Sequence, residues 1–143
     1  MNRIRITGVV ELAQALARAP GVVRGHIGGA LFAESQNILN VSGEAVPIDT
    51  GTLKSSRFTV GPEDTSRGIE VTIGYGGAAA PYAQAIHEHP SDASPKSWKG
   101  KTLNFSRPGT GTKYLERPLN EARKGFTQRV AEYARGRIER DVR

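Results

Sequence analysis

The sequence predicts a single α+β domain, in which a small, mainly antiparallel sheet packs against an N-terminal helical region and a long C-terminal helix. Apolar residues recur at helical spacing before residue 39 and again after residue 118. Between these regions, Ile69, Val71 and Ile73 alternate with polar residues, as in a half-buried strand. The length of 143 residues is that of one ordinary domain.

The N-terminal part is expected to hold one strand and two helices. Alternation over residues 3–7 predicts a short strand, and good helix formers over residues 10–19 predict the first helix. A second helix is expected over residues 23–38, and the pattern breaks at Ser42-Gly43 and at Pro47. Glycines inside this second helix indicate either a bend or a close approach by another element. They are Gly25, Gly28 and Gly29.

The middle of the chain is expected to form a β-hairpin. A short helical turn over residues 52–56 precedes two strands, at residues 57–60 and 69–73. The polar residues 61–68 contain glycine, proline and aspartate, which predicts the loop that joins these strands. Small residues over 74–80 predict a further loop.

Beyond the hairpin we expect two helices separated by a long loop. Pro81 opens a short helix over residues 82–87, and residues 89–112 are loop-like, with one strand at 102–105. Pro118 suits the first turn of the last helix, and Arg117 before it is biased away from helical structure. The apolar stripe of that helix comprises Leu119, Ala122, Phe126, Val130, Tyr133 and Ile138.

The composition excludes several classes of protein. The chain has no cysteine, so disulfides, thiolate metal sites and cysteine nucleophiles are absent. Its apolar runs are too short to cross a bilayer, and we expect no secretory signal at the N-terminus. The net charge is +6, of which residues 113–143 contribute +4 through nine basic and five acidic side chains. This charge permits contact with nucleic acid without requiring it.

The chemical motifs are weak. The sequence His87-Glu88-His89 places two histidines two residues apart, whereas zinc ligands on one helix face need a spacing of three or four. We therefore interpret it as a polar helix end that caps backbone groups or meets a partner. Neither Ser55 nor Ser56 has a neighbouring base, and residues 74–77 lack the pattern of a phosphate loop. We expect no catalytic residue, no metal and no cofactor.

Three segments carry a family resemblance. Residues 46–56 read VPIDTGTLKSS, residues 81–88 read PYAQAIHE, and residues 113–122 read KYLERPLNEA. In this order they resemble the tail-component family of tailed bacteriophages, the gene-product-ten-like minor tail or tail-completion proteins of the neck. The residues that match the motifs are Pro47, Asp49, Thr50, Gly51, Leu53, Ser56, Tyr82, Ala83, Glu88, Tyr114, Leu115 and Leu119. The sequence departs from the family pattern over residues 89–112, where many members have a shorter loop.

The matching residues also have plain architectural interpretations. Pro47 stiffens the approach to a turn, Asp49 or Thr50 can cap the short helix that follows, and Gly51 permits a sharp turn. Leucines anchor the turn and the last helix, and Ala83 allows a close approach. These are roles in assembly rather than in chemistry.

The resemblance implies a non-enzymatic structural protein of the virion. It implies a ring, expected to be a hexamer, at the head–tail junction, assembled in the host cytoplasm and joined to connector, head-closure, tail-terminator or tail-tube proteins. DNA passing through the channel would make only non-specific contacts, and no membrane is involved. The sequence does not separate tail completion from tail termination or head closure, and it does not fix the stoichiometry.

Two loops are the candidates for contacts between subunits, because their polar groups are not needed by the core. They span residues 61–68 and 89–112. Their candidate interface residues are Glu63, Arg67, Trp98 and Phe105, and tryptophan is enriched at interface hot spots.

Two other functions stay open. A small basic protein could bind DNA through its C-terminal helix, with a steep dependence on salt. A metal hydrolase could be built on His87-Glu88-His89, with zinc bound stoichiometrically.

Overall fold

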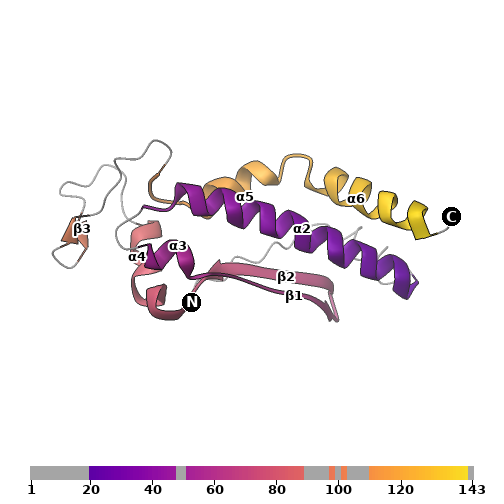
Figure 1. Ribbon diagram of the computed structural model, residues 1–143, viewed down its shortest axis with the longest axis horizontal. Coiled ribbons are helices and arrows are strands. Elements are labelled where there is room, and N and C mark those ends of the chain that lie inside the picture. The colour runs from indigo at the N-terminus through magenta and orange to yellow at the C-terminus, as the bar shows by residue number, and fades with distance from the viewer. Residues whose placement is uncertain (1–19, 48–50, 89–96, 99–100, 103–109, 142–143) are drawn as a thin grey trace.

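Helix α2 (Gly21–Ala45) is the central layer of a three-layer arrangement (Figure 1). The computed structural model describes residues 20–47, 51–88, 97–98, 101–102 and 110–141. A β-hairpin packs against one side of α2, and the C-terminal helices pack against another. The α+β prediction is confirmed. The strand expected at residues 3–7 and the helix expected at 10–19 lie outside the described residues.

Helix α2 is longer than the sequence pattern predicts. Ser42 and Gly43 do not break it, because both are used in packing. The buried Ser42 hydroxyl lies 2.7 Å from the Tyr75 hydroxyl, and a Cβ at Gly43 would clash with the guanidinium group of Arg57. The helix ends because Val46, which precedes Pro47, is extended, as residues before proline usually are.

The hairpin consists of β1 (Arg57–Thr65) and β2 (Gly68–Tyr75), paired antiparallel. The loop predicted over residues 61–68 is therefore wrong, since only Ser66 and Arg67 form the turn. The register shifts between Val60 and Glu63, so the Gly-Pro pair between them forms a bulge rather than ending the strand. Pairing resumes beyond the bulge up to the turn.

The inner face of the hairpin lies on α2. Gln36 donates a hydrogen bond to Thr59 Oγ1 at 3.0 Å, and Arg24 pairs with Asp64. A Cβ at Gly28 would lie 3.2 Å from the Pro62 ring, so this glycine allows a close approach. Of the two explanations for the helix glycines, the structure supports close approach at Gly28.

Short elements follow at one end of α2. Helix α3 (Thr52–Ser55) precedes the hairpin, and the 3-10 turn η1 (Gly77–Ala79) leads from β2 into α4 (Ala80–Glu88). These agree with the predicted helices at 52–56 and 82–87. The loop predicted at 74–80 is wrong, because β2 reaches Tyr75 and η1 follows it.

The segment after α4 contains a second, smaller strand pair. Strands β3 (Ser97–Trp98) and β4 (Lys101–Thr102) are antiparallel. The strand predicted at 102–105 overlaps β4 at Thr102, and its remaining residues lie outside the described part of the chain.

The C-terminal region forms two helices where one was expected. These are α5 (Glu116–Ala122) and α6 (Phe126–Asp141), separated at Gly125, whose φ is +67°. Pro118 lies in the first turn of α5, as predicted, and Arg117 is helical despite preceding it.

Helix α6 packs on α2. Val130 and Ala134 contact Ala30, and Arg129 Nε donates to Glu34 Oε2 at 3.0 Å. Of the predicted stripe, Leu119 and Val130 are buried, but Tyr133 is 40% exposed.

The apolar core among the described residues forms two clusters of unequal size. The smaller cluster contains Ala30, Val130 and Ala134. The larger lies where α2, α3, β2, α4 and α5 meet, and its members are Ile38, Leu39, Val46, Leu53, Ile73, Tyr75, Ala79, Ala83, Ile86, Tyr114, Leu115 and Leu119. Within the described residues, no helix combines the length and apolarity that crossing a membrane requires.

Candidate functional site

The three motif segments meet in the larger core cluster. Leu53 comes from the first segment, Ala83 from the second, and Tyr114, Leu115 and Leu119 from the third, and all five are buried there. Because these segments are separated by about 30 residues each, their contact is a property of the fold and not of local sequence. We call this region the motif junction: the buried motif residues together with the polar residues His87, Glu88, Lys113 and Glu116.

Tyr114 links the second and third segments directly. Its hydroxyl donates a hydrogen bond of 2.7 Å to the backbone carbonyl of Ala83. Its ring meets the Tyr75 ring edge-on at 5.1 Å and the His87 ring edge-on at 5.0 Å, measured between centroids. Such edge-to-face pairs contribute about 0.5–1.5 kcal/mol beyond simple burial. Tyr114 is therefore a core residue whose hydroxyl also joins the second and third segments by a buried hydrogen bond.

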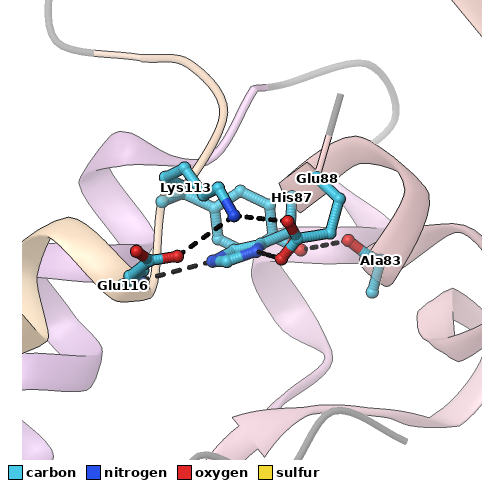
Figure 2. A network of polar contacts seen from close by, with 6 residues as sticks. Ala83, His87, Glu88, Lys113 and Glu116 are labelled. Carbon is cyan, nitrogen blue, oxygen red and sulfur yellow. Dashed lines mark hydrogen bonds and ion pairs between the residues drawn. The ribbon is translucent and has the colours of Figure 1, made fainter. Parts of the chain in front are cut away.

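His87 joins the end of α4 to the start of α5 (Figure 2). Its Nδ1 lies 2.8 Å from Glu88 Oε1, and the backbone N–H of Glu116 donates to its Nε2 at 3.3 Å. Since Nε2 accepts a hydrogen bond, the ring proton of the neutral imidazole is on Nδ1 and is donated to Glu88. The buried imidazole thus caps the first turn of α5. This fits the interpretation of the His87-Glu88 pair as a polar helix end.

Lys113 connects the two carboxylates of the motif junction (Figure 2). Its ammonium group binds Glu88 and lies 3.1 Å from Glu116 Oε2. The hydrogen bond from Lys113, followed by that from His87, lowers the pKa of the Glu88 carboxyl, and the same two carboxylates raise the pKa of Lys113. The Lys113 N–H also donates to the His87 carbonyl at 2.9 Å. With a φ of +57°, the Lys113 backbone is in the left-handed region, which these contacts hold in place.

The junction brings together a possible set of metal ligands that the sequence did not reveal. Ligand atoms of His87, Glu88 and Glu116 lie within 4.8 Å of one another. The third member comes from 28 residues further along the chain, beyond the reach of any spacing rule. The ammonium group of Lys113 bridges the two carboxylates, so a divalent cation would have to compete with it. His89, the other histidine of the motif, lies outside the described residues.

Tyr75 is a buried residue with a polar group that the sequence analysis missed, because it was assigned to a glycine-rich loop. Burial raises the pKa of its hydroxyl to about 12, although the hydrogen bond with Ser42 and the charge of Arg57 act in the opposite direction. Its place in the core could have been predicted from the alternation of β2, which continues from Ile73 to Tyr75.

The first motif segment shapes the turn into α3. Pro47 is buried, and Ser56 Oγ donates to the Leu53 carbonyl at 2.8 Å. Gly51, with a φ of +78°, occupies the N-cap position of α3, where no side chain caps the helix. The N-cap position thus falls on a glycine in the left-handed conformation, and the two residues expected to cap the helix, Asp49 and Thr50, lie outside the described part of the chain.

The candidate interface residues are only partly described. Glu63 and Arg67 are exposed on the hairpin near its turn. Phe105, Asp49 and Thr50 lie outside the described residues. Tyr82 is within α4 and Trp98 within β3, and for these two the backbone alone is described.

Comparisons with known proteins found no match: no family model, no curated protein and no solved structure is similar to this chain.

Proposed function

We propose that this protein is a structural component of a tailed-phage virion that forms a ring at the head–tail junction. The observation that supports the proposal is the convergence of the three motif segments in the motif junction. If the segments resembled an enzyme family, their polar residues would be expected to line an open pocket. Instead, the described motif residues are mostly buried in the core or hydrogen-bonded to the backbone. Residues in such positions determine the shape of the chain, and a scaffold for assembly needs a defined shape.

The arrangement of polar groups supports a structural role for the motif junction. His87, Glu88, Lys113 and Glu116 all bind one another or backbone groups. These contacts join Glu88, at the end of α4, to Lys113 and Glu116, at the start of α5. Such a junction anchors both ends of the segment between α4 and α5, so that segment can contact a neighbouring protein without disturbing the core.

The test is assembly with tail tubes. Mass measured by light scattering and negative-stain images should be recorded for the protein alone and mixed with purified phage tail tubes. We expect a monomer or weak oligomer alone, and rings or caps at tube ends in the mixture. A monomer that does not bind the tubes, but binds duplex DNA with a steep salt dependence, would contradict the proposal and favour a DNA-binding protein.

A further inference from the structure

An apolar groove runs along the contact between α2 and α6. Its volume is about 330 Å³. Its lining includes Ile27 of α2 together with Val130, Ala131, Ala134, Arg135 and Ile138 of α6. Ala131 and Arg135 are exposed, so the groove is apolar at its base and carries a cation at its side. We call it the helical groove.

The hairpin presents a different surface, on another side of α2. Thr59 faces α2, because its hydroxyl accepts a hydrogen bond from Gln36, so the next residue, Val60, points away. Val60 is 47% exposed, which is a large fraction for a valine. Its strand partner is Thr72, and Glu63 pairs with Glu70 two residues before that, so all four share the face turned away from α2. We call these four residues the outer hairpin face.

The outer hairpin face is acidic as well as apolar. The register sets Glu63 directly opposite Glu70, so this face carries two carboxylates. Within the described residues, neither Glu63 nor Arg135 forms an ion pair, so the acidic face and the basic side of the groove are complementary in charge.

We propose that the outer hairpin face of one copy docks in the helical groove of the next copy, with Val60 against the apolar base and Glu63 beside Arg135. This inference rests on the ring proposed above and names its subunit interface. The two surfaces differ and lie on different sides of α2, so one copy can use both at once (Figure 1). Contacts of this heterologous kind produce a closed ring when the rotation between copies closes.

Crosslinking tests the contact directly, because the chain has no cysteine. The double variant Val60→Cys/Ala131→Cys, treated with a short bismaleimide, should give a ladder of oligomers that ends at the ring. The two single variants, mixed, should stop at dimers. Val41→Cys/Ala131→Cys is the matched control, since Val41 is 52% exposed but belongs to neither surface. Equal yields from the two double variants, or no ladder from the first, would overturn the inference and assign the groove to another occupant, such as residues 1–19.

Charge exchange gives a second test. Glu63→Arg and Arg135→Glu should each weaken self-association about fivefold or more, because each places like charges together, and combining them should restore it. Arg140→Glu makes the same change outside the groove and should leave self-association unaltered. Sedimentation velocity over a concentration series measures all four. Failure of the combined variant to recover while each single variant weakens association would contradict the pairing.

The two proposals can fail separately. If the ladder forms but neither rings nor caps appear on tail tubes, the interface is correct and the neck function is wrong. If tubes are capped but the ladder is absent, the neck function stands and the ring uses another surface.

Discussion

The two ends of helix α2 differ in how they use their apolar residues. The C-terminal half meets the twelve-residue core cluster and the polar ties of the motif junction. The N-terminal half contacts a cluster of three, beside an open groove and the exposed Val22. The first end buries most of its apolar residues within the chain, and Val41 is the exposed exception. The second leaves apolar surface uncovered, as proteins do where another chain binds.

The prediction with the largest expected effect compares the replacement of one apolar side chain by alanine at each end. Leu53 is 4% exposed in the large cluster, and Leu53→Ala should lower the free energy of unfolding by about 2–4 kcal/mol through lost burial and a residual cavity. Ile27→Ala, beside the groove, should cost less than about 1.5 kcal/mol, because solvent already reaches that site. Urea unfolding at constant m-value measures both. Equal losses would remove the distinction between the two ends.

Tyr75 offers a pH-dependent test of burial at the junction end. Its folded-state pKa of about 12 is higher than the ordinary value of 10.0, because burial disfavours the phenolate. The neutral hydroxyl therefore contributes stability that is fully present below pH 10 and is lost as the pH rises toward 12. The loss amounts to about 2–3 kcal/mol.

Tyr75→Phe isolates this contribution. The variant lacks the titrating group, although it leaves the buried Ser42 hydroxyl without its partner and is less stable at neutral pH. The difference in unfolding free energy between the parent protein and the variant should shrink between pH 10 and 12. A constant difference across that range would show that the phenol titrates as freely in the folded protein as in the unfolded chain.

The hairpin shows what local sequence could and could not predict. The alternation of Ile69, Val71 and Ile73 correctly predicted a strand, because one face is buried against α2 and the pattern reports that burial. The Gly61-Pro62 pair was interpreted as a loop, because these residues usually end strands. The ladder with β2 continues on both sides of them, and this information lies in the partner strand rather than in the local residues.

The motif junction was predictable in its parts but not as an assembly. The sequence correctly indicated that His87 and Glu88 form a polar helix end and that Leu115 and Leu119 are core residues. That Glu116 and Lys113 complete the network could not be predicted, since they reach it across 24 or more intervening residues. Spacing rules describe one element, whereas this site depends on how two elements meet.

The close approach between α2 and the hairpin predicts opposite effects at neighbouring glycines. Gly28→Ala would place a methyl group 3.2 Å from the Pro62 ring and should destabilise the protein by about 1 kcal/mol. Gly29→Ala meets no atom within 4 Å and should stabilise the helix by about 0.5–1 kcal/mol. Thermal unfolding of the two variants compares them directly. Stabilisation by both would mean that the hairpin does not rest on α2 at this point.

The smallest expected effect concerns the hydrogen bonds and ion pairs of the motif junction. The Lys113 ammonium, and after it His87, hold the pKa of the Glu88 carboxyl below its ordinary value of 4.5. This carboxylate therefore contributes stability that is present above pH 4.5 and is lost as the pH falls through its folded-state pKa. The contribution is small, because the Glu88 side chain is 48% exposed and solvent screens it.

Glu88→Gln should therefore flatten the decline of the urea midpoint between pH 7 and pH 3 slightly, while lowering the midpoint at pH 7. Glu121→Gln is the matched control, because it removes a carboxylate that meets only Lys124 on an exposed turn of helix and should leave the slope unchanged. The size of the effect separates two views of the junction. If Glu88→Gln lowered the free energy of unfolding as much as Leu53→Ala, the hydrogen bonds and ion pairs, and not the apolar cluster, would hold the three motif segments together. A small loss would mean that apolar packing joins the segments, and that the network sets only the direction in which the chain leaves α4 and enters α5.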